Sequence, residues 1–281
     1  MEIIYSFLET LFPFSWTQFM FMKNAFIAVL LIAPLFGLVG TMIVNNRMSF
    51  FSDAMGHCAL TGIALGIMLG IDNYAISVLG FALIFALGIS SIIESGISSS
   101  DTIIGVFSSA GIALGIVILS INGGFAKYSG YLIGDILSIS KNEIKILFMA
   151  LLIVALIWIF SFNKLMLAGL NSDMARSKQI SVKFYKNIFT ILIAFIVTIS
   201  LKWVEMLIIN SLLVLPAASA KNISKSIKGY HGFSVLFSLV AGISGLIISF
   251  YAGTSPGATI VLISSVIFFT TFFINRTYNM N

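Results

Sequence analysis

The stretch that decides the fold covers residues 49–71 and reads Ser49-Phe-Phe-Ser-Asp-Ala-Met-Gly-His-Cys-Ala-Leu-Thr-Gly-Ile-Ala-Leu-Gly-Ile-Met-Leu-Gly-Ile71. An acid and an imidazole, Asp53 and His57, stand four residues apart near its start, and an apolar run follows them. Side chains at i and i+4 of a helix share one face, with Cβ atoms about 5–6 Å apart. We therefore expect the two groups to converge on one ion inside a membrane-embedded helix.

The composition of the whole chain supports a membrane location. Of its 281 residues, 59% are hydrophobic and only 9% are charged, and the mean hydropathy is +1.10. Soluble domains are far more charged, at roughly 25%. Repeated apolar runs approach the roughly 20 residues that a helix needs to cross about 30 Å of hydrocarbon. The fold class expected is an all-α, polytopic helical membrane protein with about eight to nine transmembrane helices. Barrel strands are disfavoured, because they alternate apolar and polar residues.

Nine spans are expected along the chain. The second and seventh are shorter than a normal crossing, so broken or re-entrant helices are possible there. Residues 1–19 are expected to form an N-terminal interfacial segment. Residues 20–281 are expected to form a single transmembrane domain, with a cytoplasmic segment at about 163–186. The expected spans are 20–44, 54–71, 74–93, 102–121, 143–162, 186–204, 206–220, 233–251 and 256–274.

The basic residues set the expected orientation. With the N-terminus outside, ten Lys and Arg residues lie on cytoplasmic segments and five on outer segments. Because positive charge concentrates on the cytoplasmic side, this bias favours N-terminus out and C-terminus in. The net charge of +5 is scattered between the spans, so it is better explained by topology than by nucleic-acid binding.

The pair of Asp53 and His57 has a specific chemistry. An ionised aspartate near a helix centre costs about 2.5–3.5 kcal/mol on insertion scales, and a bound cation would offset that cost. Carboxylate and imidazole together suit Zn²⁺, Mn²⁺ or Fe²⁺. Two ligands suit transit better than storage, and Thr61, one turn further on, is a candidate weak oxygen ligand. The alternative left open is that Asp53 caps the helix while His57 bonds a backbone carbonyl.

Three other features of the sequence are candidates for function. Glu205, beside Trp203, is interpreted either as a gate or second ion contact or as an outer-interface residue. His231 is expected to lie on the surface at a helix start. A short cytoplasmic docking helix is expected with Asn171 or Ser172 as its cap. Its other residues are Asp173, Met174, Ala175, Arg176 and Ser177.

Some enzyme classes are disfavoured by missing motifs. The sequence contains no G-x-x-x-x-G-K-[ST] loop, so a P-loop ATPase activity is not expected of this chain itself. It also contains no Gly-x-Ser-x-Gly elbow and no His-Glu-x-x-His pair, which weakens the membrane esterase and zinc protease interpretations.

Five segments together resemble the permease subunit of the bacterial ABC importers for zinc, manganese and iron. They keep their order over nearly the whole chain, which is more specific than any single motif. The segment at 170–180 looks like the cytoplasmic coupling helix of that family, but Asn171 stands in place of an acid and Gln179 in place of a glycine. Glu205 stands where the family commonly has glycine. The five segments are 47–66, 100–115, 131–137, 210–220 and 256–262.

The resemblance implies a fold like that of the vitamin B12 permease (type II) and an obligate homodimer. It implies two cytoplasmic ATP-binding subunits, an extracytoplasmic metal-binding protein and a place in the bacterial cytoplasmic (inner) membrane. It implies a transported Zn, Mn or Fe(II) ion with no permanently bound cofactor, and ATP hydrolysis in a partner subunit. In that family Asp53 and His57 match metal-coordinating positions, and residues 171–176 match the ATPase-coupling helix.

Two rival functions stay open from the residues alone. An ion-coupled secondary metal carrier would use Asp53 and His57 as a proton relay and would work without an ATPase. Inverted repeats are typical of such carriers, and none is evident in the sequence. An ABC permease for an iron chelate, haem or corrinoid would need a wide cavity and no intramembrane ligand pair.

Overall fold

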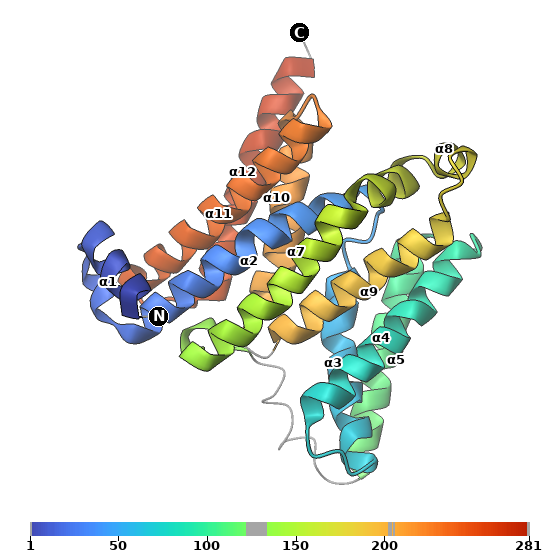
Figure 1. Cartoon of the computed structure of the whole chain (residues 1–281), viewed down its shortest axis with the longest axis horizontal. Helices are drawn as coiled ribbons and strands as arrows, with labels where there is room; N and C mark the ends of the chain where they lie inside the picture. Colours follow the sequence, from blue (N-terminus) through green and yellow to red (C-terminus); the bar gives the residue numbers. More distant parts are fainter. Residues whose placement is uncertain (1, 122–133, 202–203, 205, 280–281) are drawn as a thin grey trace. The chain divides into compact units, whose positions relative to one another are not determined.

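The computed structural model describes residues 2–121, 134–201, 204 and 206–279, and all regular elements in these ranges are helices (Figure 1). Within them, nine helices are long and apolar enough to cross a membrane. The elements are α1 (Glu2–Leu11), η1 (Ser15–Gln18), α2 (Met20–Asn45), α3 (Phe51–Met68), α4 (Tyr74–Glu94), α5 (Ser100–Ile121), η3 (Ile136–Ser138), α7 (Lys141–Leu170), α8 (Ser172–Ser177), α9 (Val182–Leu201), α10 (Met206–Ile223), α11 (Ile227–Ala252) and α12 (Pro256–Asn279).

The nine expected spans are confirmed as nine helices, with their ends shifted by several residues. The largest shift is in α7, which ends at Leu170 instead of residue 162. Asn163 and Lys164 end the apolar run there, but they do not interrupt the backbone hydrogen bonds of the helix. The two short spans, α3 and α10, are each a continuous helix of 18 residues. Pro216 lies within α10.

The chain divides into two compact units, which are described separately. The first contains residues 1–41, 135–151 and 203–281, and the second contains residues 42–134 and 152–202, apart from those not described. Helices α2 and α7 therefore each supply residues to both units. The expectation of a single domain for residues 20–281 stays a prediction.

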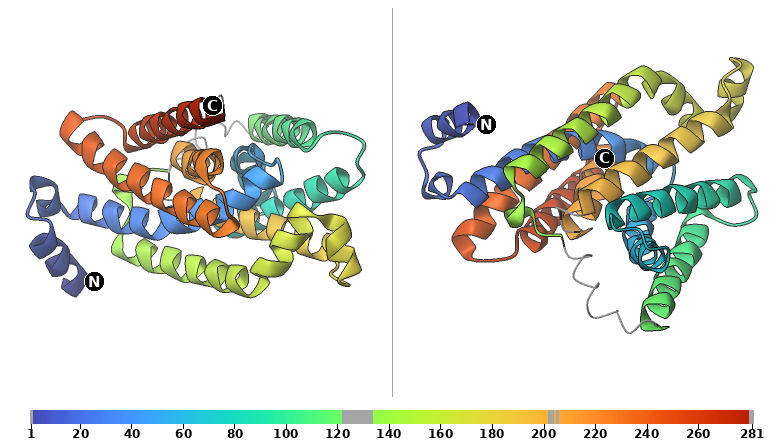
Figure 2. Two further views of the ribbon diagram at one scale, coloured as in Figure 1. Left: turned by 90° about the horizontal axis from the view of Figure 1, so that it is seen from above. Right: turned by 60° about the horizontal axis from the view of Figure 1, so that its bottom comes forward.

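In the first unit, α10, α11 and α12 pack against one another (Figure 2). Glycines allow the first part of α2 to approach this group. A Cβ atom built on Gly37 would lie 2.8 Å from the carbonyl oxygen of Ser234, and one on Gly40 would overlap the backbone of Leu213. Close backbone approach at small residues is the typical packing of membrane helices.

In the second unit, α3 is central, because it packs against α4, α5 and α9. Glycines form the contact surfaces: a Cβ on Gly62 of α3 would lie 2.6 Å from the Cα of Val78 on α4. A Cβ on Gly115 of α5 would lie 2.8 Å from the backbone nitrogen of Thr61. Small residues thus let α3 approach both α4 and α5 closely, as is typical of membrane helices.

Candidate functional site

The start of α3 places Asp53 inside the first helical turn. The N-cap position belongs to Phe50, and the helix begins at Phe51. A carboxylate in the first turn is favoured by the positive end of the helix dipole. Asp53 is therefore not the N-cap residue, and this part of the capping alternative does not describe the structure.

The side chains of Asp53 and His57 lie together on one face of α3. The distance from Asp53 Oδ2 to His57 Nε2 is 3.3 Å. Both side chains are partly accessible in the chain, with exposed fractions of 40% for Asp53 and 36% for His57, whereas most of α3 is buried. The expected placement of the two groups on one helical face is thus confirmed, and their partly open surface leaves room for a third species to reach both.

Thr61 and Cys58 point elsewhere. The Thr61 hydroxyl is buried and donates a hydrogen bond to the carbonyl oxygen of Gly111 on α5. The Cys58 thiol is buried and donates to the carbonyl of Met55, one turn earlier in α3. Eight residues along a helix correspond to about 80° of net rotation, so Thr61 does not share the Asp53 direction closely.

No cluster of three or more His, Cys, Asp and Glu side chains suited to a metal occurs within the described ranges. On α3, one chain thus offers two side chains that could bind a metal, Asp53 and His57. Glu205, the other acidic candidate for the pathway, lies outside the described residues, as do the first three residues of the segment at 131–137.

The short helix expected at residues 171–177 is present as α8. Asn171 is its N-cap, and the side-chain oxygen of Asn171 accepts a hydrogen bond of 2.9 Å from the backbone nitrogen of Met174. The Met174 side chain is exposed, whereas Ala175 is fully buried. The sequence prediction of a short capped helix is confirmed, whereas its contact with an ATPase is not tested.

The end of α8 has a Schellman-type arrangement. Gln179 adopts φ 58°, in the left-handed region, and the Ile180 nitrogen donates to the carbonyl of Ala175 at 2.9 Å. Glycine adopts this conformation without steric cost, while glutamine does not. The position at which the resemblance expects glycine is therefore one that requires a left-handed backbone.

Two polar contacts, not found from the sequence, join α9 to α4 in the second unit. Ser90 Oγ donates to Asn187 Oδ1 at 2.8 Å, and Lys183 Nζ lies 3.6 Å from Glu94 Oε2. The partners are 97 and 89 residues apart in the chain, so no local pattern indicates either contact. Because α8 contacts α9, and α4 packs on α3, these pairs lie between α8 and the helix that carries Asp53.

The expectation of a surface histidine at position 231 is wrong. His231 is only 9% exposed. Its Nδ1 lies 2.8 Å from the Ile227 carbonyl, and its Nε2 lies 3.1 Å from the Thr41 hydroxyl of α2. The cause is that α11 begins earlier than expected, at Ile227 after the Ser226 cap, so His231 lies one turn inside the helix.

Comparisons with known proteins cover nearly the whole chain. The model of the ABC 3 transport family matches residues 18–275. The manganese import system permease protein ScaB of Streptococcus gordonii is 32% identical, with 92% of each chain covered. The zinc uptake system membrane protein ZnuB of Haemophilus influenzae is 29% identical, covering 87% of this chain and 92% of the relative.

Solved structures agree with the fold. The PsaBC structure from Streptococcus pneumoniae, in complex with Fab, matches with a TM-score of 0.74 and 29% identity, covering 98% of this chain and 96% of the other. An inward-facing putative metal-chelate type ABC transporter shares the fold, with a TM-score of 0.63 and 13% identity over 97% and 96% of the two chains. Together with the nine apolar helices among the described residues, these relatives show a multi-pass integral protein of the inner membrane.

Proposed function

The chain belongs to the ABC 3 transport family, and on that premise we propose that it is the permease subunit of an ATP-driven importer for a divalent transition-metal ion. The observation that carries the proposal is the pairing of Asp53 and His57, 3.3 Å apart and partly accessible on an otherwise buried helix. The relatives are named for zinc and for manganese. Zn²⁺, Mn²⁺ and Fe²⁺ all suit a carboxylate and an imidazole.

The transport step uses few ligands for a physical reason. An ion that must move on cannot be held by a complete coordination shell, because conduction needs binding that is favourable yet weak enough for release. Asp53 supplies the negative charge that offsets the loss of hydration, and His57 supplies a nitrogen donor in its neutral form. We assign Thr61 to holding α3 against α5 through Gly111, so it acts on the site by packing.

The energy for transport comes from partner subunits in this proposal. The chain contains no P-loop sequence, so ATP-binding subunits would dock on the cytoplasmic side, at α8. Movement of α8 would reach α3 through α9 and α4, whose contacts include Ser90 with Asn187 and Lys183 with Glu94. A second route is short: a Cβ on Gly169, near the end of α7 and close to α8, would lie 3.0 Å from Oδ1 of Asn46, in the link between α2 and α3.

Two further partners complete the proposed importer. An extracytoplasmic metal-binding protein would deliver the ion, and a second copy of this chain would complete the pathway as a homodimer. Glu205 stays a proposed pathway residue, as a gate or second ion contact. Because the family commonly has glycine at this position, no role is carried over to Glu205 from the family.

Metal uptake by whole cells tests the proposal. In a strain that depends on this importer, Asp53→Ala and His57→Ala should abolish growth under zinc, manganese or iron limitation, each metal tested separately, while the amount of permease in the membrane stays unchanged. Wild-type uptake in either variant would refute the site. Uptake that persists in vesicles lacking the ATP-binding subunit would instead support an ion-coupled secondary carrier.

A further inference from the structure

Helix α1 presents three different faces along only ten residues. Tyr5 and Leu8 are buried against the rest of the first unit, to which α1 belongs. Ile4, Phe7 and Leu11 are large, apolar and exposed, with Phe7 62% exposed. Polar side chains occupy the remaining exposed face. These are Glu2, Ser6, Glu9 and Thr10.

The three faces are separate sectors of the helix. At about 100° per residue, the exposed apolar side chains fall within about 60° of one another, and the polar ones span about 100°. The buried pair lies in the gap between these two sectors. The exposed apolar surface is thus a defined edge of α1, formed by Ile4, Phe7 and Leu11.

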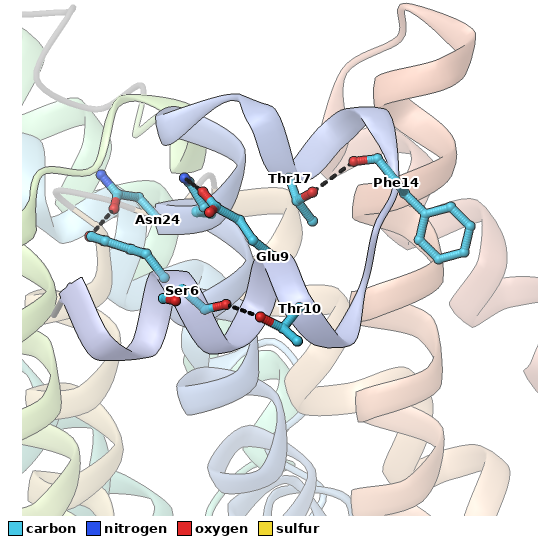
Figure 3. Close-up of polar contacts among 8 residues, drawn as sticks. Ser6, Glu9, Thr10, Phe14, Thr17 and Asn24 are labelled. Carbon is cyan, nitrogen blue, oxygen red and sulfur yellow. Dashed lines mark hydrogen bonds and ion pairs between the residues drawn. The ribbon is translucent and has the colours of Figure 1, made fainter.

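Polar contacts fix how α1 is rotated against the protein. The Tyr5 hydroxyl donates to Asn24 Oδ1 at 2.6 Å, and Asn24 in turn donates to the Ile139 carbonyl at 2.9 Å. Glu9 pairs with the buried Lys23 of α2 at 2.5 Å (Figure 3). Lys141, at the start of α7, lies 5.1 Å from the centre of the Tyr5 ring. Burial also raises the pKa of the Tyr5 hydroxyl, which keeps it a donor.

Because these contacts hold α1 in one rotation, its outward apolar edge cannot turn inward to hide from water. A ten-residue helix is about 15 Å long and cannot cross the hydrocarbon. Helix α1 has one face on the protein, one exposed apolar face and one exposed polar face. Protein, lipid and water meet only at the surface of a bilayer around a membrane protein, so that surface suits all three faces. Phe19, and Met20 and Phe21 at the start of α2, are also large, apolar and exposed.

We propose that α1 lies along the membrane surface and inserts the edge of Ile4, Phe7 and Leu11 into the acyl chains of the lipid bilayer. Ser6 and Thr10 then face the aqueous side, and Tyr5 and Leu8 face the protein. This proposal concerns the position of α1 in the membrane and goes beyond metal transport. It also separates the apolar residues of the expected interfacial segment into lipid-facing and protein-facing ones. Leu8 and Trp16, which by composition alone belong with the lipid-facing residues, are buried in the protein instead.

Spin labels on α1 test the proposal in the complete transporter, reconstituted into phospholipid vesicles. Phe7→Cys carries the label on the apolar edge, and Thr10→Cys is the matched control on the polar face of the same helix. Wild-type protein treated in parallel measures any labelling of the buried Cys58. Molecular oxygen, which concentrates in acyl chains, and a water-soluble nickel chelate serve as the two relaxing agents.

The expected result is that oxygen relaxes the label at position 7 more strongly than the chelate does, with the order reversed at position 10. Leu11→Cys repeats the test if Phe7→Cys does not assemble. Strong relaxation by the chelate at both positions 7 and 11 would overturn the proposal. So would protection at both positions that appears only when the metal-binding protein is added, or dipolar broadening between labels of two copies, because each identifies a protein as the partner of the edge.

Discussion

The two histidines of this chain occupy contrasting surroundings. The side chain of His57 is 36% exposed and lies beside a carboxylate of its own helix. His231 is 9% exposed, and its two ring nitrogens contact the Ile227 carbonyl and the Thr41 hydroxyl. A histidine whose nitrogens both bind the protein holds helices together, whereas one on an accessible face next to an acid can accept an ion. The environment of the ring, and not its presence in a span, therefore separates a candidate ligand from a structural residue.

The largest expected effect is a reciprocal result for the two histidines. His57→Gln should lower metal uptake by more than about 100-fold, because loss of even an outer-shell partner costs up to that much in metal affinity. Its thermal unfolding should change little. His231→Gln should keep uptake and lower the stability by about 1–3 kcal/mol, because it leaves buried polar groups unsatisfied. Uptake assays and unfolding scans on both variants measure this, and equal loss of uptake in both would remove the distinction.

The next effect concerns how closely α3, with His57, is held by α5. Gly115→Ala places a methyl group 2.8 Å from the Thr61 nitrogen and should destabilise the protein by about 1–3 kcal/mol by overpacking. Gly105→Ala is the matched control on the same helix, because nothing lies within 4 Å of a Cβ there. The control should be neutral or slightly stabilising in thermal unfolding. A harmless Gly115→Ala would show that α3 and α5 are not closely packed.

A smaller effect is expected at the contact between α4 and α9. Ser90→Ala removes the hydrogen bond to Asn187 and should cost about 0.5–1.5 kcal/mol. If this contact transmits movement of α8 to α3, the transporter should hydrolyse ATP at a normal rate but import less metal per ATP. Ser95→Ala is a control near the end of α4, because its hydroxyl donates only locally, to the Ile92 carbonyl. Equal metal-to-ATP ratios in the two variants would argue against transmission through Ser90.

The smallest effect is expected at Gln179. A left-handed backbone costs a non-glycine residue roughly 1–2 kcal/mol, and the greater chain entropy of unfolded glycine offsets part of this. Gln179→Gly should therefore stabilise the protein by less than about 1 kcal/mol and leave uptake unchanged. A small upward shift in the unfolding temperature is the expected measurement. A lower unfolding temperature would mean that the glutamine side chain makes a compensating contact.

The sequence predicted the parts of the structure that depend on local patterns. Apolar run length located all nine spans, and the spacing of Asp53 and His57 placed the two groups on one helical face. The Asn171 cap was also predictable, because its partner is only three residues away.

The sequence did not reveal features that depend on the packing of distant segments. The partner of the Thr61 hydroxyl is 50 residues away, and that of the Ser90 hydroxyl is 97 residues away. His231 looked like a surface residue because it was expected at a helix start. The earlier start of α11 places it one turn inside the helix, and its partner Thr41 of α2 is 190 residues away in the chain, so no local pattern indicates the contact.

Direct metal binding by the permease is the sharpest test of the central claim that Asp53 and His57 hold a travelling ion. Radioactive Zn²⁺ and Mn²⁺ are titrated separately onto purified permease in lipid nanodiscs, with wild type, His57→Ala, Asp53→Ala and His231→Gln compared. The account predicts saturable binding of at least one metal to wild type and His231→Gln, and its loss from the other two variants. Unchanged binding in His57→Ala and Asp53→Ala would contradict it.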